Sequence, residues 1–154
     1  ATVVMETESG APRYLAGLVT RFGLSHEDDR QAFYEMRLRP WLWLATRRSD
    51  FRIFQDQTVP EIVAAVLGRY GHPMEQKLHR SYRPWTYCVQ YHESDFDFVS
   101  RLCEHEGIYY WFRHEAGQHV LVFADDIASA HAPLPGGEAV RYHPHEKAGM
   151  TGGL

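Results

Sequence analysis

Apolar and polar residues alternate along the early part of the chain in the way expected of β-strands. Residues Phe33–Arg39 put apolar and charged side chains on opposite faces, with Tyr34, Met36 and Leu38 on one and Glu35, Arg37 and Arg39 on the other. Tyr14–Phe22 is apolar enough to predict a mostly buried strand, and polar Ser25–Gln31 predicts the loop between the two strands. The simplest pairing is an antiparallel hairpin, which Pro40 ends because it has no N–H to donate. The dense apolar run Trp41–Ala45 must then be buried against another part of the protein.

A helical period replaces the alternation at Thr58. Thr58 and Glu61 have the spacing of a capping box, and Pro60 lies in the first turn, where a missing N–H does no harm. Gly71 supplies a residue that can adopt the left-handed conformation at the helix end. The pattern predicts an amphipathic helix with one apolar stripe, made of Ile62, Val63, Val66, Leu67 and Tyr70.

A second helix is predicted after the strand-like segment Trp85–Tyr91. Ser94 is a typical N-cap, Asp97 occupies the reciprocal position, and acidic residues suit the positive end of a helix. Gly107 supplies the stop. The face expected to be buried consists of Phe96, Val99, Leu102 and Cys103.

Two further strands, Ile108–Phe112 and His119–Ala124, flank the turn signal Glu115–Gln118. The first of them is apolar on both faces, which is typical of a strand covered on both sides, by core or by a partner. Small residues, prolines and glycines follow Asp126 and predict a connector. The order helix, strand, helix, hairpin defines an α+β chain.

The amino-acid composition argues against several classes of protein function. The 154 residues carry 16 Lys and Arg against 20 Asp and Glu, a net charge of −4 that argues against a nucleic-acid partner. With 44% hydrophobic and 23% charged residues the chain is predicted to fold, and no apolar run is long enough to predict a direct membrane anchor. Two cysteines, Cys88 and Cys103, do not make a disulfide scaffold. The start at Ala1 and the patternless Ala148–Leu154 favour a fragment of a longer chain.

The stretch Tyr91–Phe112 concentrates side chains that bind zinc or transfer protons: His92, Glu93, Asp95, Asp97, Cys103, Glu104, His105 and Glu106. Cys103 and His105 lie two positions apart on a helix, so they point about 200° apart and cannot share an ion. No His-Glu-x-x-His occurs in the chain. We therefore expect Cys103 in the core, both histidines in solvent, and no metal or cofactor site.

Two alternative functions remain open from the residues alone. A cell-wall hydrolase would use carboxylates between Asp95 and Glu106, and it needs two of them about 5–10 Å apart in a cleft. Against it, acids two positions apart at helix ends project from different faces. A carbohydrate-binding module would use Tyr109–Phe112 and needs at least two exposed, coplanar rings. In a strand these four aromatic rings alternate between faces.

Several motifs in a fixed order resemble the VgrG family. They are Arg39–Leu44 (RPWLWL), Arg52–Gln55 (RIFQ), Thr58–Val63 (TVPEIV), Tyr91–Leu102 (YHESDFDFVSRL) and Glu106–Tyr110 (EGIYY). VgrG is the spike protein of bacterial type VI secretion, related to the hub of contractile phage baseplates. The resemblance extends from Tyr14 to Asp126.

The resemblance implies a structural protein rather than an enzyme. In the family, two β-barrel tube domains flank a small α/β lobe, and three chains form a pseudo-hexameric ring on the hexameric Hcp tube. The resemblance would make residues 1–50 the latter part of the first barrel and residues 51–126 the lobe, with two helices and an antiparallel hairpin. Residues 127–154 would be a connector into the second barrel. The family has no catalytic, metal-binding or cofactor-binding residues in this region, so none carries over.

The resemblance also implies partners and a place of action. The full-length protein is expected to be a homotrimer that binds Hcp, with a tip protein and effectors contacted by regions beyond this chain. Such a spike is assembled in the bacterial cytoplasm and secreted into the extracellular space or a target cell.

Overall fold

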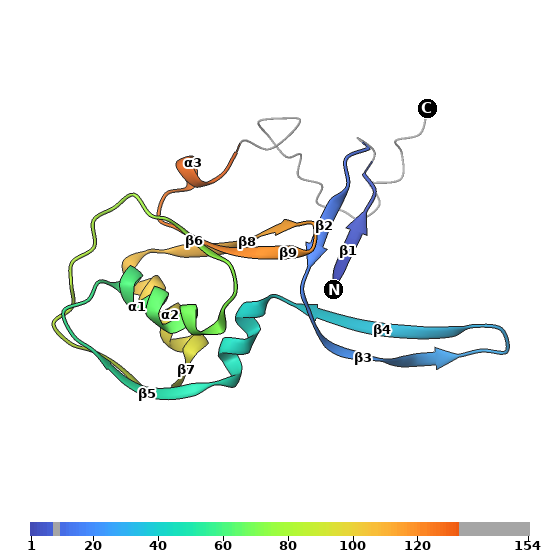
Figure 1. Ribbon diagram of the computed structural model, residues 1–154, viewed down its shortest axis with the longest axis horizontal. Helices are drawn as coiled ribbons and strands as arrows, with labels where there is room; N and C mark the ends of the chain where they lie inside the picture. Colours follow the sequence, from blue (N-terminus) through green and yellow to red (C-terminus); the bar gives the residue numbers. More distant parts are fainter. Residues whose placement is uncertain (8–9, 133–154) are drawn as a thin grey trace, which may run out of the picture.

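The computed structural model describes residues 1–7 and 10–132, which form a helical lobe and a projecting pair of strands (Figure 1). The connector expected over 127–154 falls mostly outside the described residues, and its described start contains the short helix α3 (Ile127–Ala130). Mixed helices and mainly antiparallel sheets confirm the α+β class. The four sheets of the described part contain two or three strands each, and none closes into a barrel.

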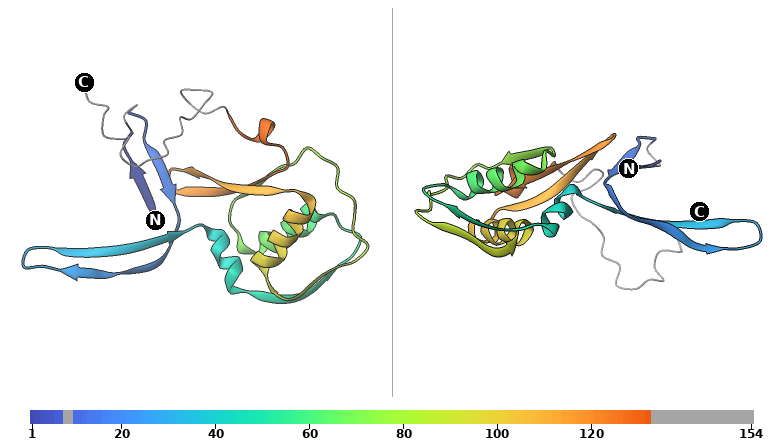
Figure 2. Two further views of the ribbon diagram at one scale, coloured as in Figure 1. Left: turned by 180° about the vertical axis from the view of Figure 1, so that it is seen from behind. Right: turned by 60° about the horizontal axis from the view of Figure 1, so that its bottom comes forward.

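Two antiparallel pairs form the early part of the chain. Strand β1 (Thr2–Met5) pairs with β2 (Arg13–Ala16), and β3 (Leu18–Glu27) pairs with β4 (Ala32–Arg39). The β3–β4 hairpin extends away from the lobe in both views of Figure 2.

The single strand predicted over Tyr14–Phe22 is wrong, because Gly17 divides it into β2 and β3. A Cβ at Gly17 would lie 3.1 Å from the carbonyl oxygen of Arg39, so glycine allows β3 to start beside the end of β4. The loop predicted over Ser25–Gln31 is shorter than expected, because β3 continues to Glu27.

The apolar run after Pro40 is buried, as predicted. It forms a 3-10 helix, η1 (Trp41–Arg47), that buries Trp41, Leu42 and Ala45. Strand β5 (Ser49–Phe54) follows and pairs antiparallel with β7 (Cys88–Ser94). The strand predicted at Trp85–Tyr91 therefore begins and ends three residues later.

Both predicted helix starts are confirmed. Helix α1 (Val59–Leu67) has the complete Thr58–Glu61 capping box, and α2 (Asp95–Glu106) has the Ser94 hydroxyl accepting from the Asp97 N–H at 3.0 Å. After α1 a 3-10 turn, η2 (Gly68–Tyr70), leads to Gly71, whose φ of 66° is the predicted left-handed stop. Gly107, with φ 67°, ends α2 in the same way.

The predicted hairpin of the lobe belongs to a three-stranded sheet. Strand β8 (Tyr109–Glu115) pairs antiparallel with β9 (Gln118–Ala124), and β6 (Met74–Lys77) adds to β9 in parallel. Neither β5 nor β6 was predicted from the sequence. The turn at residues 116–117 has Gly117 at φ 85°.

One hydrophobic core joins η1, both helices and the three-stranded sheet. Helices α1 and α2 pack against each other, and α2 also contacts η1. Phe98 is fully buried on α2, whereas Phe96 is only partly buried, which corrects the predicted face. The core side chains with no more than 2% exposure include Trp41, Val59, Ile62, Val63, Val66, Leu67, Phe98, Val99, Leu102, Cys103, Leu121 and Phe123.

Candidate functional site

The projecting hairpin has one apolar and one charged face. The Cα register pairs Val19 with Leu38, Phe22 with Met36, and Leu24 with Tyr34, so these six side chains share a face. The register shifts between Val19 and Arg21 and again after Leu24. An extra residue at each shift keeps Val19 and Phe22, three positions apart, on the same side of the strand.

The apolar face of the hairpin is open to solvent. Phe22 is 65% exposed and Tyr34 is 63% exposed, and their rings stack with centroids 5.5 Å apart. The strand was predicted to be mostly buried, and among the described residues it is not. The register confirms that Tyr34, Met36 and Leu38 face one way. Exposed apolar faces of this kind are typical of surfaces that take part in interactions.

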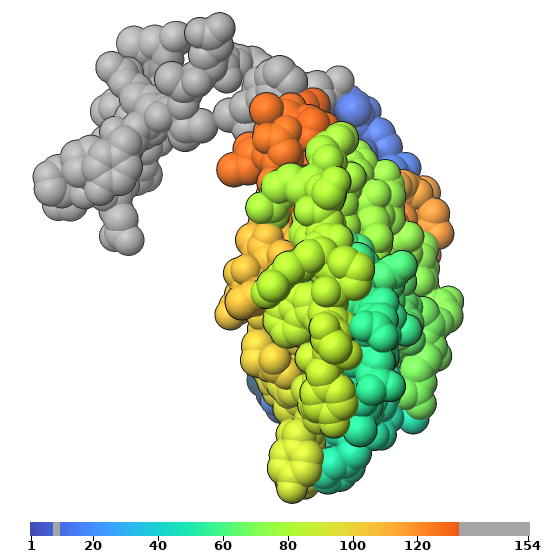
Figure 3. Space-filling model, turned by 90° about the vertical axis from the view of Figure 1, so that its left-hand side faces the viewer, coloured from blue at the N-terminus to red at the C-terminus, as the bar shows by residue number. Residues whose placement is uncertain are grey.

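A second exposed apolar group lies on the lobe, on the outer face of β5–β7. Phe51 and Tyr91 are cross-strand partners whose rings meet edge to face at 5.3 Å, and Ile53 lies two positions further along β5. His92 is the extra residue of a bulge opposite Phe51 and has a left-handed φ of 51°. Strands β5 and β7 both reach the face of the molecule seen in Figure 3.

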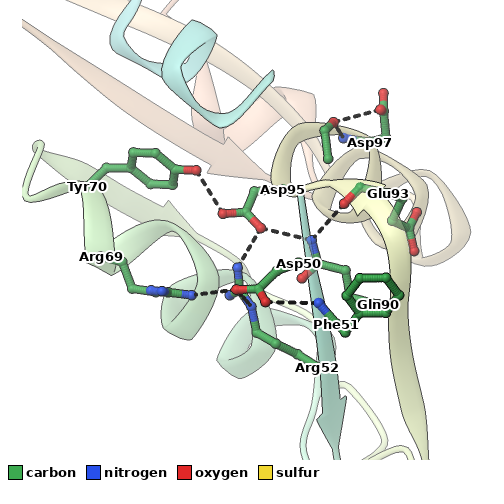
Figure 4. A network of polar contacts seen from close by, with 10 residues as sticks. Asp50, Phe51, Arg52, Arg69, Tyr70, Gln90, Glu93, Asp95 and Asp97 are labelled. Atoms are coloured by element: carbon green, nitrogen blue, oxygen red, sulfur yellow. Dashed lines mark hydrogen bonds and ion pairs between the residues drawn. The ribbon is translucent and has the colours of Figure 1, made fainter. Parts of the chain in front are cut away.

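Beneath this sheet a buried carboxylate joins three elements. Asp95 has no exposed side-chain surface; it accepts from the Tyr70 hydroxyl at 2.7 Å and the Gln90 amide at 2.8 Å, and it pairs with Arg52 (Figure 4). Arg52 also pairs with Asp50 at 2.9 Å, and Asp50 accepts from Arg69 at 3.2 Å. The negative charge is thus compensated inside the protein, as a buried charge requires.

The network perturbs the tyrosine that it contains. Burial of Tyr70, together with its hydrogen bond to the Asp95 carboxylate, raises the pKa of its hydroxyl to about 12. Tyr70 therefore stays a neutral donor at any physiological pH. The arrangement fastens η2 to β5, β7 and the start of α2.

Asp125 fixes the segment between β6 and β7 in a similar way. Its carboxylate accepts from the backbone N–H groups of His79 and Arg80 at 3.0 and 2.9 Å and from the Tyr82 hydroxyl at 2.8 Å. Burial alone would raise the pKa of Asp125, but these donors more than offset it and hold the pKa below its usual value. The carboxylate thus anchors this loop to the end of β9.

Two histidines of the three-stranded sheet accept hydrogen bonds from earlier parts of the chain, one from η1 and one from β2. The buried His119 of β9 accepts from the Trp41 N–H at 2.8 Å, and His114 of β8 accepts from the Ala16 N–H at 3.1 Å. Burial, with His114 and His72 nearby, lowers the pKa of His119. A neutral imidazole is the form that can accept these bonds.

The residues considered for zinc lie apart. Cys103 is buried in the core while His92 and His105 are exposed, which confirms their predicted placement. Within residues 1–7 and 10–132, no group of three His, Cys, Asp or Glu side chains is arranged to hold a metal ion.

The carboxylates of the hydrolase alternative do not converge. Asp95 and Glu106 lie at opposite ends of the 12-residue α2, about 16 Å apart along its axis. Asp97 is held by the Ser94 hydroxyl at 2.6 Å, and Glu106 accepts from the Trp85 indole at 3.2 Å. These acids cap and brace α2 rather than face one another across a cleft.

The aromatic residues of β8 divide between two faces, as the alternation predicts. Tyr110 and Phe112 pack against the core. Tyr109 and Trp111 stack at 5.8 Å on the other face, where His131 lies 4.3 Å from the Trp111 ring centroid. Both of these rings are half-buried, so the strand is covered on both sides.

Most of this surface was not predicted from the sequence. Asp95 was considered as a helix-terminus acid and as one of the hydrolase carboxylates, but its buried pairing with Arg52 was not predicted. The exposure of Phe51 and Ile53 and the histidine contacts were not predicted either. The signal available in the sequence was the short run Phe51, Arg52, Ile53, Phe54, whose aromatic and β-branched residues are typical of a strand.

Exposed apolar strand faces such as those of β3–β4 and β5–β7 are typical of proteins that assemble with others. The chain belongs to the phage tail baseplate hub (GPD) family, whose model matches residues 1–152. Within that family its relatives are the VgrG spike proteins, and the resemblance inferred from the motifs is confirmed.

Two named relatives show the range of the match. The chain is 49% identical over 144 residues to the type VI secretion system spike protein VgrG1c of Pseudomonas aeruginosa, covering 93% of this chain and 20% of that protein. It is 39% identical over 123 residues to the actin cross-linking toxin VgrG1 of Vibrio cholerae, covering 77% of this chain and 11% of that protein. The chain thus spans about a fifth or less of these relatives.

A solved structure shares the fold. The E. coli c3393 protein is described as a component of the type VI secretion system with structural similarity to the T4 bacteriophage tail proteins gp27 and gp5. It superimposes with a TM-score of 0.74 at 32% identity, covering 84% of this chain and 37% of that chain. Among the described residues, no helix is long and apolar enough to cross a membrane.

Proposed function

We propose that this chain is a hub-like part of a VgrG spike and that its role is structural, not catalytic. In the full-length protein it helps to form a homotrimeric base that docks on the hexameric Hcp tube. Sheath contraction then drives the spike from the bacterial cytoplasm into the extracellular space or a target cell. The actin cross-linking activity in one relative's name is not carried over, since the matched part is 11% of that protein.

Each of the three segments expected from the resemblance has its own structural role in this proposal. Residues 1–50 contribute strands to the first tube domain, 51–126 form the bracing lobe, and 127–154 lead into the second tube domain. The buried Asp95 and Asp125 contacts suit a lobe that must stay rigid under load.

The observation that carries the proposal is the open apolar face of the β3–β4 hairpin. Each large side chain there gains about 1.5–3 kcal/mol when it is fully covered. Phe22, Leu24 and Tyr34 together therefore give a strong drive towards assembly, and the unpaired outer edges of both strands can accept further strands.

The test is the solution mass of the full-length protein, alone and mixed with the Hcp ring. We expect a trimer that binds one ring. Phe22→Asp places a charge on the apolar face and should dissociate the trimer. Phe33→Asp is the matched control, because it makes the same change on the opposite face of the same hairpin.

Two outcomes of this test would contradict different parts of the proposal. A monomeric wild-type protein that ignores Hcp would overturn the spike assignment. A trimer equally weakened by both variants would show that the apolar face has no special role in assembly.

A further inference from the structure

A hollow opens at the root of the hairpin, between η1, the first turn of α2 and strand β8. It has a volume of about 260 Å³, and its lining includes Leu42, Trp43, Phe96, Tyr110 and Phe112. An apolar cavity of about 150 Å³ is large enough to bind benzene. The hollow therefore has room for one large apolar side chain and offers it an almost entirely apolar wall.

Two arginines without ion pairs among the described residues lie at Trp43, and one of them, Arg39, lines the hollow. The guanidinium groups of Arg39 and Arg47 lie over the Trp43 ring, 5.1 and 5.9 Å from its centroid. None of the ion pairs in the described part of the chain involves either of them, whereas Arg52 and Arg101 each pair with a carboxylate.

The same positive charge continues along the hairpin. Arg37 and Arg39 point to the same face of β4, and Arg21 is the direct cross-strand partner of Arg37. Two like charges placed opposite each other destabilise a strand pair. Neither Arg21 nor Arg37 has an ion pair among the residues that the structure describes.

The charge reverses on the other side of the hollow. A neighbouring surface depression shares Phe96 and Tyr110 with it and is lined by Asp97 and Glu104. A ligand lying across the hollow would thus meet arginines at the hairpin end and carboxylates beyond Phe96.

We propose that this surface, which we call the root groove (Arg21, Arg37, Arg39, Trp43 and the hollow), binds a protein segment with a specific pattern. The segment carries an aromatic or large aliphatic side chain that enters the hollow, with Asp or Glu residues on one side of it that meet the arginines. Charge complementarity selects the acidic flank, and the apolar walls select the anchor. A polyanion such as polyphosphate would engage the arginines but leave the hollow empty.

The groove lies on the charged side of the hairpin, opposite the apolar face described above. The inference therefore does not rest on trimer formation. It goes beyond the proposed function by naming the chemistry of a partner.

The test measures fluorescence polarisation of labelled peptides titrated with the full-length protein. The probe has the sequence Asp-Glu-Asp-Gly-Phe-Gly. Two controls replace Phe by Gly, or the three acidic residues by Lys. We expect only the probe to bind, with a dissociation constant below about 1 mM.

Two variants address the two halves of the groove. Arg37→Glu reverses a charge, and Thr46→Trp fills the mouth of the hollow from an exposed position on η1. Each should weaken binding about tenfold, which corresponds to about 1.4 kcal/mol. Arg30→Glu, the same charge change in the hairpin loop, is the matched control and should leave binding unchanged.

Several results would overturn the proposal. They are no binding of the probe up to about 1 mM, equal binding of either control peptide, or equal weakening by Arg30→Glu. Polyphosphate that binds as tightly as the probe and is insensitive to Thr46→Trp would assign the arginines to a polyanion instead.

Discussion

At the scale of single residues, Asp95 illustrates how one carboxylate can hold three elements together. It accepts hydrogen bonds from Arg52 of β5, Tyr70 of η2 and Gln90 of β7. Because the Asp95 side chain is fully buried, water cannot readily take the place of its carboxylate if it is removed, and the donors that face it would lose an acceptor.

Asp95→Ala is therefore expected to lower the free energy of unfolding by about 3 kcal/mol, because Arg52 would lose its buried partner. Urea unfolding of the two proteins measures the difference. Asp97→Ala, two residues further along the same helix and exposed, should cost no more than about 1 kcal/mol. Equal losses would show that the helix terminus, and not the buried pairing, accounts for the effect.

The two thiols are expected to be unreactive in the folded protein. Burial raises the pKa of the Cys103 thiol to about 12 and also raises that of Cys88. Since the thiolate is the reactive species, a disulfide reagent at about pH 8 should label neither cysteine until the protein is unfolded. Rapid labelling of the native protein would contradict this placement in the core.

The sequence reveals some residue roles and hides others for a physical reason. The capping of α1 by Thr58 and of α2 by Ser94 depends on neighbours three positions away, so the local pattern predicts it. The burial of Asp95 depends on Arg52, which lies 43 positions away, and an acid in the first turn of a helix has the same local signature whether exposed or buried.

At the scale of elements, the contact between β9 and η1 should be sensitive to acid. The pKa of His119 is lowered in the folded state by burial and by the neighbouring His114 and His72. The unfolded state therefore binds a proton more readily below about pH 6.5, and the free energy of unfolding should fall as the pH drops from that value. Urea unfolding between about pH 7.5 and 5.5 measures the slope.

His119→Gln should flatten this slope, because an amide oxygen can accept from the Trp41 N–H without titrating. His105→Gln, on the exposed side of α2, provides the control and should keep the wild-type slope. A slope that survives His119→Gln would place the acid sensitivity elsewhere.

The elements themselves were predicted well where the pattern was periodic. Both helices and the β8–β9 hairpin match, while the strand over Tyr14–Phe22 does not, because its break at Gly17 reflects a close approach to Arg39 from a distant part of the chain. Strand β6 has only four residues and pairs with β9 in parallel, so nothing local identifies it.

At the scale of the whole molecule, the hairpin and the lobe should be energetically separable. The described contacts of the apolar face lie within the hairpin, whereas the core lies in the lobe. The double variant Phe22→Ser and Tyr34→Ser should change the unfolding free energy of this chain by less than about 0.5 kcal/mol. It should also reduce the fluorescence of a bound apolar dye.

Glu35→Gln, on the charged face, is the control and should leave the dye signal unchanged. A large loss of stability in the double variant would mean that the hairpin belongs to the same cooperative unit as the lobe.

The cross-strand arginines of the hairpin also affect how readily the chain aggregates between its synthesis and its assembly. A newly made chain carries an apolar face on strands with open edges, which is the usual starting point for irregular aggregates. Arg21 and Arg37 project from the opposite face of the same strands, so two hairpins that align edge to edge with the same face upward bring four positive charges to one side of the joined sheet. The pair weakens each hairpin slightly. The same repulsion disfavours irregular association of identical hairpins. Association remains favourable where these charges are separated or neutralised.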